Sequence, residues 1–307
     1  MKIALYYKHR HGGVYRRITE IQRRSRYDVE IVSELPRPGD YDIIHSYSDS
    51  HGGQIHTAEC NMCQAIDFSK RFSKYAMKHF VKGLDELYNL RRYEKIIAKS
   101  ERDFNFLKKF NFNLSLIRAG VDLDVFKPGN VDWLREKLRL ENKKIVLFVS
   151  RIEEAKGVNL VLRAVPLLPE DWVLLTIGEP AVSAPEIKET DRIRFLGPVP
   201  HDGIVDYYNL ADVFCLPSWT ECFPLTILEA LACERPVVAT DVGDIKKILE
   251  PPLGGYICDF DHRDIARKVV EAEKSVDGKD CRRMASKYTW AETVQREEKV
   301  WEEIYRG

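Results

Sequence analysis

Two glutamates, Glu221 and Glu229, stand eight residues apart where the sequence pattern changes from strand to helix. The apolar run before Pro217 predicts a short buried strand, and from Pro224 onward apolar residues recur with helical spacing. We therefore expect Glu221 in the turn and Glu229 about a turn and a half along the helix. The unpaired N–H groups of the helix N-terminus between them attract an anion such as a phosphate. Two carboxylates that can bind hydroxyls, beside a phosphate cradle, suit a nucleotide-sugar better than a simple nucleotide.

Two cations are expected near the same place. Arg151 and Lys156 follow a predicted strand at residues 143–150, and ligands bind at the carboxyl edge of open parallel sheets. Arginine can bind two phosphate oxygens at once and lysine supplies a point charge, so both can stabilise a departing diphosphate. The alternative is a solvated loop in which these cations pair with Glu153 or Glu154.

Three motifs together resemble a known family. The Glu-x7-Glu spacing with residues 230–243, the stretch 148–158 and the stretch 118–128 are similar to the retaining family 4 glycosyltransferases of the GT-B fold. This family includes glycogen synthase-like and mannosyltransferase-like enzymes, the "glycosyl transferases group 1". The resemblance covers residues 93–307 well and residues 1–92 loosely. It implies an α/β fold of two Rossmann-like domains whose parallel sheets face across a cleft, with a C-terminal helix crossing back to the first domain.

The resemblance also implies roles for residues of the second domain. Arg151 and Lys156 would hold the donor diphosphate, Glu229 the ribose hydroxyls, and Glu221 the sugar hydroxyls near the reacting carbon. Three backbone N–H groups would face the sugar and diphosphate, those of Phe223, Leu225 and Thr226. No protein base is implied, because a phosphate oxygen takes the acceptor's proton.

In the first domain, Gly12 and Gly13 follow the first predicted strand, where the family has a glycine-rich loop over the sugar and phosphate. An ordinary tight turn is the alternative. His56 resembles the histidine that many members place beside the donor sugar, and His45 is the second choice. Closure of the cleft would bring Gly12, Gly13 and His56 onto the donor. About ten residues separate the predicted strands near His45 and His56, so this domain is a shortened version.

Metal binding is a competing interpretation of the same region. His51, His56, Cys60 and Cys63 contain a Cys-x-x-Cys spacing that is also seen at structural zinc sites. Chance spacing in a loop is the alternative. Two Asp-x-Asp triplets, at residues 122–124 and 259–261, are interpreted as turns. We expect neither a divalent metal nor another cofactor in the reaction, because Arg151 and Lys156 supply the positive charge.

Length and charge favour two domains with different partners. A chain of 307 residues exceeds one ordinary domain. The expected divisions are an acceptor-side domain at 1–122, a donor-binding domain at 123–288 and a terminal helix at 289–307. Residues 1–130 contain 23 Lys and Arg against 16 Asp and Glu, a net +7, and the remainder contains 25 against 32, a net −7. The basic half is expected to meet the acceptor, or a membrane that carries it.

Cysteine usage favours a reducing compartment. Seven cysteines, an odd number, fall mostly inside apolar runs and indicate reduced thiols in the cytoplasm. The first residues predict a strand rather than a signal peptide, and no apolar stretch approaches the length of a membrane span. We therefore expect a cytoplasmic protein, with peripheral contact at the inner membrane face as a further expectation.

A basic amphipathic helix is the feature that could make such a contact. Four lysines recur at i+4 spacing between residues 69 and 82, at Lys70, Lys74, Lys78 and Lys82. Such a helix can lie on an anionic membrane and would suit a lipid-linked acceptor. The alternative is a solvated face above a stripe that packs on the core.

Strand and helix patterns alternate through the chain, which predicts parallel sheets covered by helices. Expected strands are residues 2–7, 28–33, 41–46, 53–57, 95–99, 143–150, 172–178, 192–197, 212–216, 236–240 and 255–259. Expected helices are residues 14–25, 68–92, 157–167, 202–210, 224–234, 262–274 and 289–305.

The sequence thus favours a metal-independent retaining glycosyltransferase of the hexosyltransferase class. It would transfer a sugar from a nucleotide-diphosphate sugar to a sugar or lipid-linked hydroxyl, without a nucleic-acid partner. A non-catalytic nucleotide-sugar binder and a nucleotide-sugar epimerase on the same fold are the alternatives. Departures from the family pattern at Ser150, Pro224, Glu234 and residues 244–247 leave the charged residues in place. The base, the sugar and the acceptor are open at this point.

Overall fold

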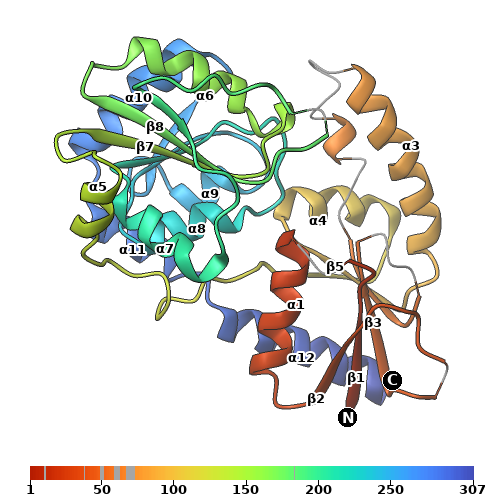
Figure 1. Ribbon diagram of the computed structural model, residues 1–307. Helices are drawn as coiled ribbons and strands as arrows, with labels where there is room; N and C mark the ends of the chain where they lie inside the picture. Colours follow the sequence, from red (N-terminus) through yellow and green to blue (C-terminus); the bar gives the residue numbers. More distant parts are fainter. Residues whose placement is uncertain (10–11, 38, 49–51, 59–62, 67–72, 183) are drawn as a thin grey trace. The chain divides into compact units, whose positions relative to one another are not determined.

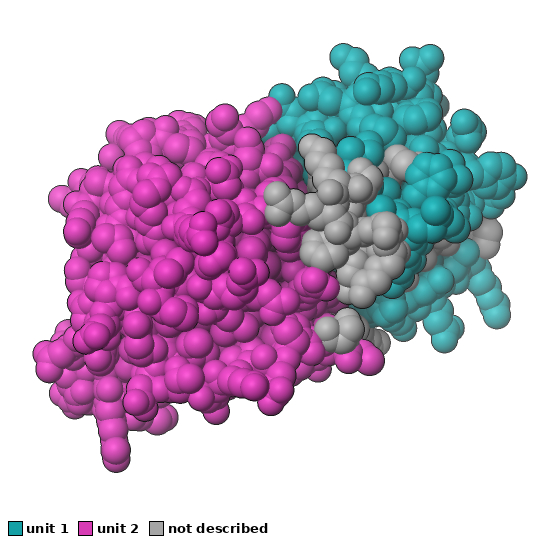
Figure 2. Space-filling model, turned by 90° about the horizontal axis from the view of Figure 1, so that it is seen from above, with its two compact units in different colours: residues 1–120, 288–307 teal, residues 121–287 magenta. Residues whose placement is uncertain are grey.

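The computed structural model describes residues 1–9, 12–37, 39–48, 52–58, 63–66, 73–182 and 184–307 (Figure 1). The chain forms two compact units, coloured separately in Figure 2. The first consists of Met1–Gly120 together with Tyr288–Gly307, and the second of Val121–Lys287. The terminal segment from Tyr288 onward therefore returns to the unit that contains the N-terminus. No helix in the described ranges has both the length and the hydropathy of a membrane span.

The first unit is built on a six-stranded parallel sheet in the order β2-β1-β3-β4-β5-β6. Its strands are β1 (Lys2–Tyr6), β2 (Asp28–Val32), β3 (Ile43–Tyr47), β4 (Ile55–Thr57), β5 (Lys95–Ala98) and β6 (Leu114–Leu116). Its helices are α1 (Gly12–Arg24), α3 (Ser73–Leu90), α4 (Glu101–Leu107), the 3-10 turn η1 (Lys108–Phe110) and α12 (Trp290–Arg306). Seven residues, 48–54, separate the parallel neighbours β3 and β4, which is fewer than a crossover connection usually needs.

Alternating side chains give this sheet two buried faces. Ile3 and Leu5 of β1 belong to a core cluster with residues of α1 and α12, whereas Ala4 and Tyr6 belong to a separate cluster. This two-residue period is that of a β-strand. Leu90 of α3 and Leu107 of α4 pack in a third cluster with Ile96 and Ala98 of β5. Helices therefore cover both faces of the sheet.

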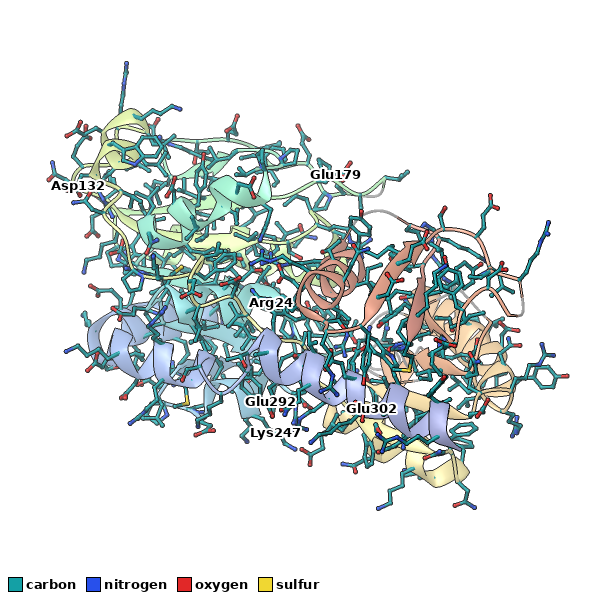
Figure 3. All side chains as sticks on the ribbon, turned by 90° about the horizontal axis from the view of Figure 1, so that it is seen from below. Arg24, Asp132, Glu179, Lys247, Glu292 and Glu302 are labelled. Carbon is teal, nitrogen blue, oxygen red and sulfur yellow. The ribbon has the colours of Figure 1, made fainter. Side chains whose placement is uncertain are left out.

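The C-terminal helix α12 is part of the core of the first unit, and Figure 1 shows it (blue) beside α1 (red). Arg17 of α1 donates through Nε at 3.0 Å to Glu297 of α12, 280 positions away in the sequence. The same glutamate accepts from the hydroxyl of Tyr47 at 2.9 Å, and all three side chains are buried. Glu292 and Glu302 lie toward opposite ends of α12 (Figure 3), and Glu302 accepts from the Tyr27 hydroxyl at 2.7 Å.

The second unit has a parallel sheet in the order β12-β11-β10-β7-β8-β9. Its strands are β7 (Lys144–Val149), β8 (Trp172–Ile177), β9 (Ile193–Phe195), β10 (Val213–Leu216), β11 (Val237–Thr240) and β12 (Gly255–Cys258). Its helices are α5 (Asp132–Lys137), η2 (Glu154–Lys156), α6 (Val158–Ala164), η3 (Val165–Leu167), α7 (His201–Leu210), α8 (Leu225–Ala232), α9 (Ile245–Leu249), α10 (His262–Ser275) and α11 (Gly278–Ala285). Buried apolar runs in β8 and β10 explain why these strands are covered on both faces.

Of the strands and α-helices named above, five were not expected from the sequence: β6, α4, α5, α9 and α11. All are short, with three to eight residues, so each offers few periodic apolar positions. Two begin at side-chain caps, because Ser100 accepts from the N–H of Asp103 and Asp277 accepts from that of Lys279. The other expected elements are present with ends shifted by a few residues, apart from residues 68–72 of the helix expected at 68–92, which lie outside the described ranges.

We predict that the stability of the first unit falls as the pH is lowered. His45 is fully buried in β3, where its Nδ1 accepts from the Trp301 N–H at 3.3 Å and its Nε2 faces the Thr57 hydroxyl at 2.8 Å. Burial, and secondarily the charge of Arg17, holds the pKa of His45 well below its ordinary value. The folded state therefore binds fewer protons than the unfolded state below about pH 6.5, and the free energy of unfolding decreases by up to about 1.4 kcal/mol per pH unit.

Denaturant titrations at pH 7 and pH 5.5 measure this slope. His45→Gln should flatten it, whereas His262→Gln, at a half-buried histidine of the second unit, should leave it unchanged. Equal pH dependence in the wild type and in His45→Gln would contradict the assignment.

Candidate donor site of the second unit

The strand order of the second unit reverses between β7 and β10. From β7 the chain proceeds to β8 and β9 on one side, then returns to build β10, β11 and β12 on the other. Loops that leave the carboxyl ends of two such strands diverge, and the crevice between them is where open α/β sheets bind ligands. Both of the charged motifs singled out in the sequence leave the sheet at this place.

Close backbone contact holds the two loops together. The N–H of Trp219, after β10, donates to the carbonyl of Ala155, after β7, at 2.9 Å. Gly157 has φ of +77°, and a Cβ at that position would lie 2.0 Å from the Pro217 carbonyl oxygen. Only glycine combines this φ with this approach. The loops are therefore positioned by backbone contacts and not by side chains alone.

Lys156 and Glu221 meet across these loops. The Nζ of Lys156 lies 2.8 Å from Oε1 of Glu221, and the hydroxyl of Ser218 donates to the same oxygen at 2.9 Å. The side chains are 20% and 12% exposed, so the pair is partly desolvated but open to solvent on one side. The Ser218 carbonyl in turn accepts from the Thr240 hydroxyl at 2.5 Å. The structure thus brings together a cation and a carboxylate that the sequence separates by 65 positions.

A third loop, after β11, fixes the backbone of Glu221 from another direction. Gly243 has φ of +59°, and its Cβ position lies 2.4 Å from the Glu221 carbonyl oxygen. The N–H of Asp244 donates to the Cys222 carbonyl at 3.1 Å. Residues 244–247, which follow Gly243, differ from the family pattern. The hydrogen bond of Asp244 therefore places the first of these residues against the turn that contains Glu221.

Arg151 has a different environment from Lys156. Its side chain is 68% exposed, and its guanidinium pairs with Glu153 at 3.0 Å. The pairing is the one foreseen in the alternative interpretation of a solvated loop. An exposed arginine on a loop at this edge can still reorient toward an anion, so its predicted role stays a prediction.

Glu229 lies inside the second unit rather than on its surface. It belongs to α8 and is 5% exposed, and the hydroxyl of Tyr208 in α7 donates to its Oε2 at 2.7 Å. Tyr208 was missed in the sequence, as was Ser218, because neither belongs to a spaced motif. The helix starts at Leu225, one residue later than expected, and its N-cap Pro224 makes no side-chain hydrogen bond. The first turn of α8 therefore lacks a side-chain cap that would compete with an anion.

The residues of this site lie in a part of the chain that matches a known protein family. Residues 143–274 match the sequence model of the family described as glycosyl transferases group 1. This part of the chain is therefore similar to a group 1 glycosyltransferase domain. The matched range contains Arg151, Lys156, Glu221 and Glu229.

Relatives of this chain include D-inositol 3-phosphate glycosyltransferases. The protein of that name from Mycolicibacterium smegmatis is 29% identical over 289 residues, covering 84% of this chain and 66% of the relative. The one from Mycobacteroides abscessus is 35% identical over 144 residues, covering 43% of this chain and 32% of the relative. The chain thus spans just under two thirds of the length of the first of these relatives, at 66%.

Solved structures show the same architecture. Sucrose-phosphate synthase from Thermosynechococcus elongatus has a TM-score of 0.80 at 19% identity, covering 100% of this chain and 99% of that one. Anabaena HepE in complex with UDP and glucose has a TM-score of 0.77 at 16% identity, covering 98% and 99%. The expected GT-B fold, with two Rossmann-like units, is confirmed.

The first-unit residues that were predicted to close onto the donor differ in their exposure. Gly12 begins α1 with φ of +79°, and a Cβ at Gly12 or Gly13 would meet no atom within 4 Å. His56 is fully buried in β4, where its Nδ1 lies 2.9 Å from the Ser46 hydroxyl and its ring stacks on Tyr93. His56 is thus enclosed within the first unit, and its predicted role beside the donor sugar, like that of His45, stays a prediction.

The metal alternative is only partly covered by the structure. His51 and Cys60 lie outside the described residues, and Cys63 is buried. Within the described ranges, no group of three or more His, Cys, Asp or Glu side chains could hold a metal. The two Asp-x-Asp triplets are turns, as expected. Asp122 accepts from the N–H groups of Asp124 and Val125, and Asp261 caps α10 through the N–H of Arg263.

The four buried cysteines of the second unit are unsuited to be nucleophiles. They are free thiols, at Cys215, Cys233, Cys258 and Cys281. Burial raises the pKa of Cys233 and of Cys281 to about 12, and it raises those of Cys215 and Cys258 as well. Since the thiolate is the reactive form, these residues act as small apolar side chains.

We predict that Gly157→Ala disrupts the loop contact that positions Lys156. Gly197→Ala is a matched control, because Gly197 has φ of +68° but its Cβ position meets no atom within 4 Å. The control should cost about 1 kcal/mol of unfolding free energy from the left-handed backbone alone. Gly157→Ala should cost roughly twice that or more, because the clash with Pro217 adds to the strain. Denaturant unfolding of both variants measures the difference, and equal losses would show that the contact does not constrain Gly157.

Proposed function

We propose that this chain is a retaining glycosyltransferase that uses a nucleotide-diphosphate sugar as donor and needs no divalent metal. The observation that carries the proposal is the meeting of Lys156 and Glu221, 2.8 Å apart, at the strand reversal of a group 1 domain. A sugar donor with a diphosphate requires a fixed cation beside a hydroxyl-binding carboxylate, and this edge of the sheet provides both.

Lys156 would bind the diphosphate and stabilise the negative charge that develops as the sugar leaves. The carboxylate of Glu221 holds the Nζ in place before the donor arrives, so little reorganisation is needed. The uncapped first turn of α8 adds backbone N–H groups of the correct polarity, in the segment of Phe223, Leu225 and Thr226. Arg151 would supply a second cation by turning from Glu153 toward the phosphates.

The two glutamates would then bind different hydroxyls. When a phosphate takes over the charge of Lys156, Glu221 is released to accept hydrogen bonds from the sugar near its reacting carbon. Glu229, oriented by Tyr208, would accept from the ribose. The acceptor hydroxyl would attack on the face from which the diphosphate leaves, with a phosphate oxygen taking its proton.

The comparisons narrow the donor and acceptor to be tested first. One similar structure is that of HepE in complex with UDP-glucose, and another is that of a UDP-forming trehalose-phosphate synthase in complex with glucose-6-phosphate. The curated relatives are named D-inositol 3-phosphate glycosyltransferases. We therefore include a uridine donor and a phosphorylated sugar or cyclitol acceptor in the proposal. The net charge of +7 over residues 1–130 suits an anionic acceptor or an anionic membrane. A cytoplasmic location, with peripheral membrane contact, belongs to the same proposal.

We predict that donor binding depends on Lys156 and Glu229. A saturating uridine, guanosine or adenosine diphosphate sugar should raise the wild-type melting temperature by roughly 5 °C for the correct base. Lys156→Met and Glu229→Gln should abolish that shift. Lys279→Met, at an exposed lysine of α11, should keep it. A wild type that responds to none of the nucleotide sugars would overturn the proposed donor site.

We also predict the stereochemical outcome and the metal requirement. With the responding donor and a phosphorylated acceptor, nuclear magnetic resonance should show a product with the donor's anomeric configuration, and excess chelator should leave the rate unchanged. An inverted product would refute retention, and loss of activity with chelator would refute metal independence. Donor binding without turnover would identify a non-catalytic binder, and an altered free sugar without acceptor would identify an epimerase.

A further inference from the structure

The helix α3 carries an exposed apolar stripe. Large apolar side chains project from it with exposures between 45% and 64%, at Met77, Phe80, Val81, Leu84 and Tyr88. Their spacing of i, i+3, i+4, i+7 and i+11 places them within about a third of the helix circumference, at about 100° per residue. Scattered exposed apolar residues are ordinary, whereas a contiguous row on one helix marks an interaction surface.

The opposite side of α3 makes core contacts. Gly83, Glu86 and Leu90 are buried. They lie between about a third and a half of a turn from the centre of the stripe, at about 100° per residue. Leu90 belongs to a core cluster against which Leu87 also packs. The helix is therefore anchored by this side, and α3 lies along one side of the first unit (Figure 1).

Positive side chains border the stripe. Lys78 and Lys82 are exposed along one flank. At the C-terminal end, the guanidinium of Arg92 lies over the ring of Tyr88, 5.4 Å from its centroid, and Arg91 is exposed next to it. Long basic side chains can lay their methylene stems along an apolar surface while their charges reach an anionic one.

The positive charges beside the stripe favour an anionic lipid bilayer over a second copy of the chain as its partner. Two copies of the chain packed stripe to stripe would bring the same lysines and arginines together, and like charges at close range repel. The planar surface of an anionic lipid bilayer accepts an apolar stripe and pairs with the cations along its flank and at its C-terminal end. We propose that α3 is the docking surface of this protein for an anionic lipid bilayer, with the apolar stripe inserted at the headgroup level.

This proposal rests on the membrane contact that the proposed function includes. It is tested separately from the transferase reaction, because vesicle binding is measured without donor or acceptor. The intact chain is mixed with sedimentable vesicles of phosphatidylcholine, or of phosphatidylcholine with phosphatidylglycerol. Binding is expected to the anionic vesicles and to weaken at high salt, where surface charges are screened. Binding to neutral vesicles should be several-fold weaker.

Matched variants separate the stripe from ordinary surface residues. Leu84 is 52% exposed on α3, and Leu167 is 53% exposed on η3 of the second unit. Leu84→Ser should weaken partitioning roughly fivefold or more, since a leucine no longer enters the headgroup region, and Leu167→Ser should not change it. Lys82→Glu should weaken binding by a similar factor, while Lys279→Glu, at an exposed lysine of the second unit, should have little effect.

Several results would overturn the proposal. One is a folded wild type that sediments with neither kind of vesicle. Another is equal loss of binding in Leu84→Ser and Leu167→Ser. A third is self-association at micromolar concentration that Leu84→Ser abolishes, which would assign the stripe to a second copy. Circular dichroism and the melting temperature confirm that each variant is folded before its binding is compared.

Discussion

The contact between the loop after β7 and the loop after β10 is the constraint on which the second unit's site depends. Parallel strands bring their carboxyl ends to one edge, but the reversal of strand order sends the two connecting chains apart. The hydrogen bond from Trp219 to Ala155 and the close approach of Gly157 to Pro217 hold the two loops in contact. Lys156 and Glu221 can face each other only because their backbones are joined in this way.

The Lys156–Glu221 pair itself contributes little to stability. Both groups remain partly exposed, and ion pairs of that kind are typically worth less than about 1 kcal/mol. What the pair provides is orientation: the lysine is held at the carboxyl edge of β7, and Ser218 fixes the carboxylate. The pair therefore keeps a cation and a carboxylate at fixed positions beside each other at this edge of the sheet.

The sequence predicts the sheets and the charged motifs, because these depend on local patterns. Apolar runs such as that of β10 and the turn-to-helix change after Pro217 follow from periodicity alone. It does not predict Tyr208 or Ser218, since their hydrogen bonds to Glu229 and Glu221 depend on how elements pack. The burial of His56 was missed for the same reason. From the sequence, a histidine at the end of a short strand is expected to be exposed. In the structure, β4 lies between β3 and β5, and His56 is fully buried.

Two buried helical glutamates each join two helices of their own unit. Glu297 of α12 is fully buried, and the guanidinium of Arg17 neutralises it while Tyr47 donates to its other oxygen. Removing either charge would leave the other buried, which typically costs several kcal/mol, so this pair holds α12 against α1. Glu229 is nearly as buried, at 5% exposed, and the hydroxyl of Tyr208 donates to its Oε2 at 2.7 Å. This hydrogen bond joins α8 to α7 within the second unit, just as the bond from Arg17 to Glu297 joins α1 to α12 within the first.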